Sequence, residues 1–499
     1  MKPVFAILTF LAVVWLRGSV VAQPLSPAQT RQDLQFLKRK LDLLHPGLGF
    51  YTPKSRIEFL YDSLHSYLNG PVAYLTFYRH ISPLVSSLKD GHTNLNHRRG
   101  YISRDTRYLP FFLRKADDDL YYVSHNMSDD TALRRGTQLL TINGRTLADL
   151  HQTLMNADRS GSDGDNLTGR QQWSLYQFAD YYAAWFGSAD SLTIGYRLAV
   201  GSDTLTRQTR LACPRLDQFR ARLQQRYGPE PDNRPNLALR IVDTATHTAL
   251  LRVSTFMGPK KYDPFQWAFN RQLKRAFRQL KQQGVENLIV DLQNNGGGIV
   301  VNSARLLQYW LPNRFRMMER EHLKRAARAE LVTRWNPFSA LNFSLNYKPD
   351  GQGGFANRAH RQWFQPRHRL AFRGKLYFLM NGASFSATTT VLAKTLDAGI
   401  GTFVGEATGG AYWGDFAGHF KTITLPNSRI QVRIPLKKLT HAVDTQHANG
   451  FTVEPDYAVS RTQTDILQGR DAILEHTLNL VRRGVVAQRQ WPASVVLAR

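Results

Sequence analysis

The sequence predicts an α/β protein whose central sheet is largely parallel. Three short apolar segments have the length and composition of buried strands, at residues 249–253, 287–292 and 376–380. Three segments with helical periodicity alternate with them, at residues 264–283, 299–311 and 386–398. This order implies parallel strands with helices on the faces of the sheet, because a parallel pair needs a long crossover connection.

Length and composition agree with a globular protein of several domains. The chain has 499 residues, of which 42% are hydrophobic, enough for two or three domains and a large core. Cys213 is the only cysteine, so the chain has no intramolecular disulfide and no thiolate cluster for a metal. The formal net charge of +27 favours anionic surroundings.

The first 22 residues have the pattern of a signal peptide. Lys2 supplies a positive charge before an apolar run that ends at Leu16, and residues 20–22 form a small-residue cleavage site. A membrane anchor is the alternative, but a spanning helix needs about 20 apolar residues and Arg17 interrupts this run. We therefore expect an exported protein, periplasmic or extracellular, without a transmembrane segment.

The rest of the chain divides by pattern into three parts and a tail. Residues 23–104 are mainly of helical pattern, residues 105–215 contain short strands, and residues 216–485 carry the α/β alternation. Residues 486–499 form a C-terminal tail. Within the third part, the stretch at 316–365 is basic and rich in Asn, Pro and Gly, which predicts an irregular surface excursion or lid.

Ser386 lies where a buried strand runs through small residues into a helix. A helix N-terminus offers unpaired amides and the positive end of the helix dipole, so the amide of Ala387 could stabilise an oxyanion formed beside Ser386. The alternative is that Ser386 merely caps the helix, as serine often does. The segment fits a nucleophile without being a specific motif.

A second segment ends a strand in three consecutive glycines. Gly296, Gly297 and Gly298 can adopt positive φ and let main-chain amides face a bound group. A plain loop is the alternative. Phosphate binding is disfavoured, because the stretch lacks the Gly-Lys-Ser/Thr ending of a Walker loop and the spaced glycines of a dinucleotide-binding loop.

His92 follows an Asp-Gly turn near the N-terminus. An imidazole has the side-chain pKa closest to neutrality, which suits a general base for a serine hydroxyl. The chain has 15 histidines, so a solvated or hydrogen-bonded loop residue is the alternative for any one of them.

Taken in order, these motifs resemble the carboxy-terminal-processing (tail-specific) serine peptidases. The resemblance rests on four ordered segments: Asp90-Gly-His92-Thr93, Asn295-Gly-Gly-Gly298, Asn381-Gly-Ala-Ser-Phe-Ser386-Ala387 and Val404-Gly-Glu-Ala-Thr-Gly-Gly410. Residues 425–428, 449–456 and 471–480 are similar to the closing elements of that family. The resemblance covers nearly the whole chain after residue 22.

The resemblance assigns roles residue by residue. Ser386 matches the nucleophile, and the amides of Gly296, Gly297 and Ala387 match the oxyanion hole. The lysine-using branch has a lysine shortly after Val-Gly-Glu, but this chain has Ala411 and its neighbours there. His92 instead resembles the histidine of the tricorn-type branch. The third catalytic residue stays open between three acids, Asp444, Glu454 and Glu406.

The resemblance also implies an architecture. The core at 216–485 would be a crotonase-like (ClpP-like) spiral, preceded by an N-terminal helical domain at 23–104 that carries the Asp-Gly-His-Thr loop. Residues 136–144 resemble the central hairpin of a PDZ domain, so residues 105–215 would be an inserted PDZ-like β domain. Residues 151–188 have a helical pattern and would interrupt that domain.

The predicted function is an exported serine endopeptidase that acts on a polypeptide substrate through a Ser386 acyl-enzyme, with His92 as general base. It needs no cofactor and no metal, and we expect no nucleic acid partner. The alternative is a non-catalytic peptide or apolar-ligand binding protein on the same scaffold. Basic runs at 271–281 and 316–328 leave open a peripheral contact with anionic envelope surfaces, although the first is also the expected wet face of an amphipathic helix. The sequence leaves the oligomeric state open.

Overall fold

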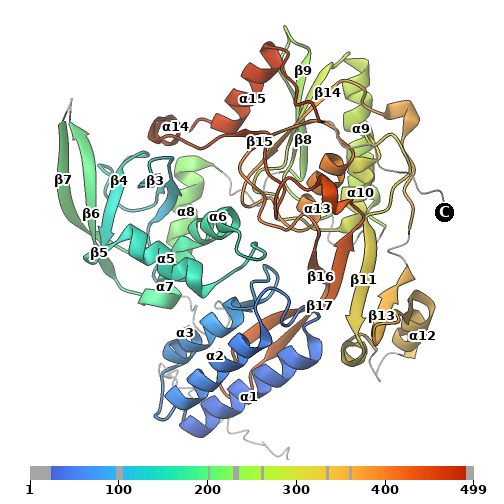
Figure 1. The fold of residues 1–499 in the computed structure, drawn as a ribbon. Coiled ribbons are helices and arrows are strands. Elements are labelled where there is room, and N and C mark those ends of the chain that lie inside the picture. Colours follow the sequence, from blue (N-terminus) through green and yellow to red (C-terminus); the bar gives the residue numbers. More distant parts are fainter. Residues whose placement is uncertain are drawn as a thin grey trace, which may run out of the picture.

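The computed structural model describes residues 24–96, 105–200, 203–228, 235–259, 263, 265–332, 337–358 and 362–489. The predicted signal peptide at 1–22 lies outside the described residues, as does most of the predicted tail. Figure 1 shows the N-terminal helices at one end of the molecule, a sheet with its own helices beside them, and an α/β core.

The N-terminal part consists of three helices, α1 (Pro27–Leu44), α2 (Lys54–Tyr67) and α3 (Tyr74–Ser86). Ser26 caps α1 in a reciprocal pair of hydrogen bonds with Gln29. The apolar faces of these helices pack against the long strands β16 (Gly414–Thr424) and β17 (Gln431–His441), which extend from the core toward them (Figure 1). Residues at the two ends of the sequence therefore share one hydrophobic core.

The middle part is an antiparallel sheet with helices on one side. Its strand order is β2 (Phe111–Lys115), β3 (Tyr121–Asn126), β4 (Gln138–Ile142), β6 (Ser191–Val200) and β7 (Asp203–Ala212), with β5 (Arg145–Thr146) paired to β4. Three helices lie between β5 and β6 in sequence, α5 (Leu147–Ala157), α6 (Leu167–Tyr176) and α7 (Phe178–Phe186). The helical pattern predicted at 151–188 corresponds to them, and α8 (Leu216–Tyr227) follows the sheet.

The core sheet has the parallel arrangement that the sequence predicts. Its order is β18 (Tyr457–Ala458), β15 (Thr402–Gly405), β14 (Lys375–Met380), β10 (Asn287–Asp291), β9 (Thr248–Val253) and β8 (Leu237–Asp243). Every neighbouring pair is parallel except β8 with β9. Its helices are α9 (Trp267–Gln282), α10 (Val300–Leu307), α13 (Ala387–Asp397) and α15 (Ala472–Arg482), whereas α14 (Gln463–Gln468) packs against β3 of the middle sheet. The mixed α/β class is confirmed.

Helix α9 is amphipathic, and the basic run at 271–281 lies along it. Phe269, Leu273 and Phe277 are buried against the sheet, as their spacing predicts. The helix begins at Trp267 instead of the predicted residue 264, so Phe265 lies before it and is 62% exposed.

The prediction of an irregular stretch at 316–365 was wrong. It contains three strands, β11 (Met318–Lys324), β12 (Tyr347–Pro349) and β13 (Gly354–Asn357), in a sheet of order β1 (Asn94–Asn96), β17, β11, β13, β12, and two helices, α11 (Arg328–Leu331) and α12 (Pro337–Asn346). Buried and exposed residues alternate in β11, but one buried position is Glu321, which pairs with buried Lys437 at 3.0 Å. This inward charge pair hid the strand pattern.

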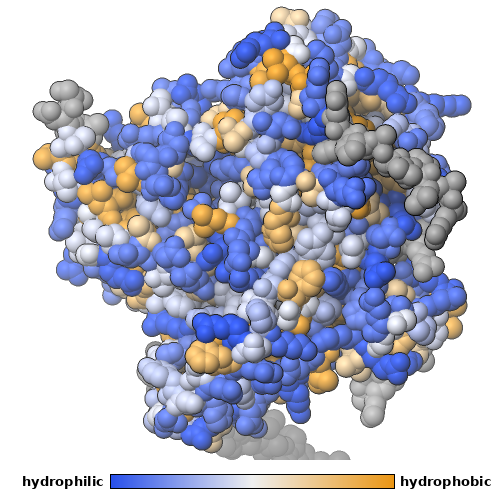
Figure 2. Space-filling view, viewed as in Figure 1, coloured by the Kyte–Doolittle hydropathy of each residue, from blue (hydrophilic) through white to orange (hydrophobic). Residues whose placement is uncertain are grey.

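No helix among the described residues is long and apolar enough to span a membrane. Figure 2 shows a face that is mostly hydrophilic, with apolar residues in small separate groups.

We predict that Asp33→Ala loosens the docking of α1 on the core hairpin. Asp33 is fully buried, and its carboxylate accepts the amides of Asn427 and Ser428 at 2.8 Å each, in the turn between β16 and β17. Removing it leaves buried donors unpaired, which should lower the free energy of unfolding by about 2–4 kcal/mol. Denaturant titration measures this. Asp42→Ala, at an exposed position of the same helix, is the control, and an equal loss in both variants would contradict the assignment.

Candidate active site

Ser386 lies at the turn between β14 and α13, as the sequence predicts. Its backbone has φ 56° and ψ −126°, a conformation that L-residues rarely adopt and that costs on the order of 1–3 kcal/mol. Tertiary contacts hold this turn, because the amide of Phe385 donates to the carbonyl of Asn295 at 3.1 Å and the Ser384 hydroxyl donates to the carbonyl of Leu292 at 2.9 Å. The turn is thus fixed to the glycine loop.

The glycine loop packs directly against Ser386. A Cβ built on Gly297 would lie 2.9 Å from both the Ala387 nitrogen and the Ser386 Cβ, and its φ of 99° also favours glycine. The amide of Gly297 donates to the Asn295 side chain at 2.9 Å. It is therefore engaged, contrary to the expectation that it faces an oxyanion. The amides of Gly296 and Ala387 donate to no group in the described part of the chain.

His92 lies within hydrogen-bond distance of Ser386. Its Nε2 is 3.1 Å from the Ser386 Oγ, although the two residues are 294 positions apart in the sequence. The imidazole is 6% exposed and lies against two aromatic rings, with centroids 4.6 Å away for Phe385 and 5.6 Å for Phe420. The His92 imidazole and the Ser386 hydroxyl therefore meet in a largely desolvated environment.

Hydrogen bonds connect the loop that carries His92 to the middle part and, through Asp163, to the core. Gly91 donates its amide to the Asp163 carboxyl at 3.0 Å and accepts the amide of Gly161 at 2.9 Å. The second oxygen of Asp163 accepts the amide of Ala411 at 3.4 Å. A Cβ on Gly91 would lie 2.5 Å from the nitrogen of Ser162, so this close approach needs glycine.

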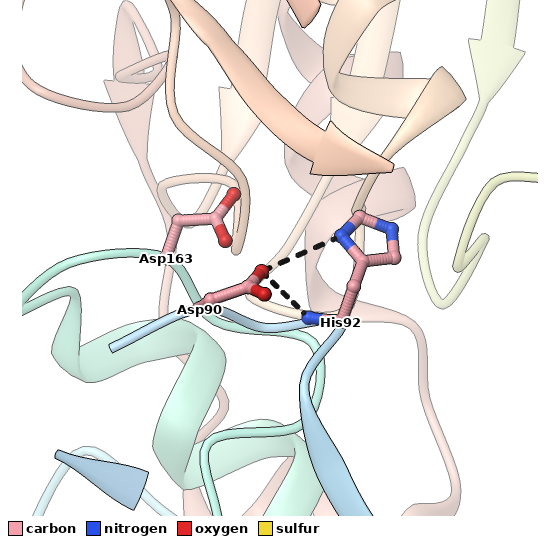
Figure 3. A group of neighbouring side chains, drawn as sticks. All are labelled: Asp90, His92 and Asp163. Atoms are coloured by element: carbon pink, nitrogen blue, oxygen red, sulfur yellow. Dashed lines mark hydrogen bonds and ion pairs between the residues drawn. The ribbon is translucent and has the colours of Figure 1, made fainter. Parts of the chain in front are cut away.

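Asp90 faces the second ring nitrogen of His92 (Figure 3). The Nδ1 of His92 lies 3.9 Å from the Asp90 Oδ1, and the same oxygen accepts the backbone amide of His92 at 3.0 Å. Nδ1 is buried and has no hydrogen-bond partner among the described residues. Asp90 is thus the carboxylate nearest to the position of an orienting acid, about 1 Å too far for a hydrogen bond.

His45 and Thr93 hold Asp90 from the other side. The Oδ2 of Asp90 is 3.0 Å from the His45 Nε2 and 2.5 Å from the Thr93 hydroxyl. The amide of Gly47 donates to the His45 Nδ1 at 3.1 Å, so Nδ1 carries a lone pair and Nε2 carries the proton that faces Asp90. The orientation of this carboxylate is therefore determined by its neighbours.

The three acids proposed from the sequence have other partners. Asp444 accepts the amide of Gln446 at 2.9 Å, and Glu454 accepts the hydroxyl of Thr452 at 2.6 Å. Glu406 accepts the amide of Gly382 at 3.4 Å. None of these contacts involves His92. Asp90, two residues before His92 in the Asp-Gly-His turn, could have been proposed from the sequence as the acid that orients it.

Burial and nearby carboxyls set the ionisation of this region. Burial raises the pKa of Asp163 well above its ordinary value, with Asp90 and Asp415 adding to the effect. Burial also raises the pKa of Asp415 to about 7, again with a contribution from Asp90. For Asp90, burial opposes ionisation, but the hydrogen bonds from His45 and Thr93 and the nearby imidazoles outweigh it and lower the pKa. Of the three carboxyls, Asp90 is thus the one whose surroundings favour the anion, whereas those of Asp163 and Asp415 favour the protonated form.

The His92 imidazole is neutral at physiological pH. Burial lowers its pKa to about 4; the charge of Asp90 partly opposes this shift and that of Arg433 adds to it. A neutral imidazole with an unprotonated Nε2 can accept the proton of a serine hydroxyl.

Asp90, His92 and Asp163 are also close enough to hold a metal ion, since one ligand atom from each lies within 4.8 Å of the others. Each carboxylate oxygen of the two acids already accepts a hydrogen bond from a protein donor. These donors account for the geometry of the cluster without an ion.

A cavity of about 500 Å³ borders the loop of His92. Tyr51 and Gly164 line it, and the amide of Gly164 donates to the carbonyl of Lys89 at 2.8 Å. Its other lining residues are Asp165, Asn166, Leu167, Thr168, Ala407, Phe451, Thr452 and Glu454.

Comparison with known proteins identifies the class. The family model of Peptidase family S41 matches residues 247–459, which include the glycine loop and Ser386. Residues 247–459 are a Peptidase family S41 domain, of the carboxy-terminal-processing family, and the chain is a serine-type peptidase. The family acts on polypeptides. No curated protein matches the chain in sequence.

Solved structures extend the similarity of fold to most of the chain. Mature CPAF complexed with lactacystin has 16% identity and a TM-score of 0.65, with 92% of this chain and 98% of that chain covered. Mature CPAF has 16% identity and a TM-score of 0.64, with 92% and 99% covered. At this identity the likeness concerns the fold.

We predict that Asp415→Asn stabilises the protein at high pH. The folded protein holds the proton of Asp415 up to about pH 7, whereas an unfolded chain releases it near 3.8, so the wild type loses stability as the pH rises between these values. Asparagine cannot ionise. The variant should gain about 2–4 kcal/mol relative to the wild type between pH 4 and pH 8.

Thermal unfolding across this pH range measures the gain. The exposed substitution Asp62→Asn is the control and should show no pH-dependent difference. A difference between Asp415→Asn and wild type that stays constant from pH 4 to pH 8 would show that Asp415 titrates normally.

Proposed function

We propose that this protein is an endopeptidase in which Ser386 attacks the peptide carbonyl and His92 is the general base. The observation that carries the proposal is the 3.1 Å separation of the His92 Nε2 and the Ser386 Oγ. A serine hydroxyl is a poor nucleophile unless a base removes its proton. His92 is within reach, neutral, and shielded from bulk water.

The mechanism follows from the placement of these groups. As the Ser386 Oγ forms a bond to the carbonyl carbon, its proton passes to the His92 Nε2, and the carbonyl oxygen becomes an oxyanion. The unengaged amides of Gly296 and Ala387 are the proposed donors to it, and Gly297 permits their close approach. His92 then gives its proton to the leaving amine, and a water, activated by His92 in turn, hydrolyses the acyl-enzyme.

We assign Asp90 the role of positioning His92. A base that accepts a proton at Nε2 must carry one at Nδ1, and Asp90 is the anionic group facing that atom. A small closure of the loop would turn the 3.9 Å approach into a hydrogen bond. Catalytic hydrogen bonds are often long before substrate binds.

The domain organisation predicted from the sequence is consistent with this function. We propose an N-terminal helical domain at 23–104, a PDZ-like domain at 105–215 and a catalytic core at 216–485. Export by a signal peptide at 1–22 is also a proposal, supported by the pattern of that segment. N-terminal sequencing of the mature protein tests it, and a mature chain that still starts at Met1 would contradict it.

We predict that Ser386→Ala and His92→Ala each lower kcat by about 10⁴-fold or more on a cleavable peptide, because each removes one half of the nucleophile pair. A fluorophosphonate probe gives a second measurement. It should label the wild type, fail to label Ser386→Ala and label His92→Ala weakly.

Ser63→Ala, an exposed serine on α2, is the matched control and should react like the wild type. Labelling and turnover that ignore both active-site substitutions would favour the alternative of a peptide or apolar-ligand binding protein. Circular dichroism of each variant separates lost chemistry from lost folding.

We predict that Asp90→Asn lowers kcat by on the order of 10²- to 10⁴-fold with a smaller change in KM. The charge of Asp90 raises the pKa of His92, so its removal should move the acidic limb of the kcat/KM profile to lower pH. A purely structural role would not move this limb in that direction. Asp165→Asn, an exposed acid of a neighbouring loop, is the control.

A further inference from the structure

Arg433 is a largely desolvated cation near His92, and no carboxylate of the described residues forms an ion pair with it. Its guanidinium lies 3.5 Å from the centre of the Phe420 ring, and it makes no hydrogen bond or ion pair with any residue that the structure describes. Burial lowers its pKa, an effect that the charge of Asp90 partly opposes. A guanidinium offers five donors, and desolvating it without an acceptor is unfavourable.

Strand pairing fixes Arg433 next to the active-site loop. It lies on β17 opposite Asn94 of β1, and β1 begins two residues after His92. Phe420 bridges the two side chains, since its ring is 5.6 Å from the imidazole of His92 and in contact with the guanidinium. Phe420 is 38% exposed, so this wall of the active site opens to solvent.

Two lysines of the same hairpin are paired with carboxylates, whereas Lys438, like Arg433, lies over an aromatic ring. Lys421 lies 2.6 Å from Glu330, and Lys437 lies 3.0 Å from Glu321. Arg433 has instead an aromatic platform and free donors, an arrangement that suits a ligand carboxylate.

We propose that Arg433 is the subsite that binds a carboxylate of the polypeptide substrate close to the scissile bond. The proposal rests on the proposed peptidase function and names its substrate class. The carboxylate belongs to a Glu or Asp side chain flanking the cleaved bond or to a free C-terminus. Both present the same planar pair of oxygens to the guanidinium fork.

Such a subsite would couple substrate binding to the base. The charge of Arg433 lowers the pKa of His92 in the free protein. A bound carboxylate would offset that charge and make the imidazole a stronger proton acceptor. A substrate with a carboxylate at this position would thus raise the pKa of His92 and make it a stronger base for its own cleavage.

The test uses a synthetic peptide library to find a cleaved sequence, followed by matched peptides with Glu or Gln at each position flanking the bond, each with a free or amidated C-terminus. We expect the wild type to prefer one carboxylate form by about tenfold or more in kcat/KM. Arg433→Gln should bring that ratio close to one, and Arg433→Lys should restore it in part. The control Arg429→Gln removes an exposed charge from the same hairpin and should keep the wild-type ratio.

The position of the effect distinguishes the two carboxylates. Sensitivity to Glu-to-Gln replacement identifies a side chain, and sensitivity to amidation identifies the terminus. Arg433→Gln should also move the acidic limb of kcat/KM for an uncharged peptide to higher pH, a shift that a structural role would not produce. A wild type without carboxylate preference, or a preference that survives Arg433→Gln, overturns the proposal.

A binding arm separates this proposal from the peptidase function. Dissociation constants of Ser386→Ala for the same peptides, with and without Arg433→Gln, measure carboxylate recognition without turnover. A wild type that cleaves peptides with no role for Arg433 removes the subsite and keeps the peptidase. If the protein cleaves no peptide but binds carboxylate peptides only when Arg433 is present, the subsite is supported and the peptidase function is contradicted.

Discussion

Asp163 is the group on which the assembly of the site depends. One buried carboxyl accepts the amide of Gly91, from the loop after the N-terminal helices, and the amide of Ala411, from the core. Asp163 itself belongs to the loop between α5 and α6 of the middle part. Three distant stretches of chain therefore meet at one side chain. The raised pKa of Asp163 suits this place, because a neutral carboxyl costs far less to bury than a charged one.

The carboxyls of Asp90, Asp163 and Asp415 lie close to His92, whose proposed role sets two requirements. As the proposed base, His92 must stay neutral, which burial and Arg433 favour by lowering its pKa. It must also keep a fixed orientation, which calls for one anion near Nδ1. Asp90 meets the second requirement because His45 and Thr93 supply donors to it, while the raised pKa values of Asp163 and Asp415 disfavour further negative charges beside it.

Much of the core was predictable because it rests on local pattern. Buried parallel strands are continuous apolar runs, and the helices that cover them are amphipathic, so β9, β10, β14, α9 and α13 were found within a few residues of their observed ends. The proximity of His92 and Ser386 followed from family resemblance, not from spacing. Inward-facing charges hid β11, and the role of Asp163 and Arg433 depends on strand register and loop contacts that no single segment encodes. Local sequence predicts helices and strands, whereas Asp163 and Arg433 contact residues of other segments, which local sequence does not reveal.

The 294-residue interval between base and nucleophile has a consequence for the life of the molecule. A nascent or unfolded chain carries the imidazole and the alcohol as two unremarkable, separated side chains, and neither attacks a peptide bond. In the proposed mechanism, the two side chains form a catalytic pair only in the folded chain, after the last third of the polypeptide has been synthesised. A chain whose last third is not yet made therefore lacks the pair of side chains on which the proposed hydrolysis depends.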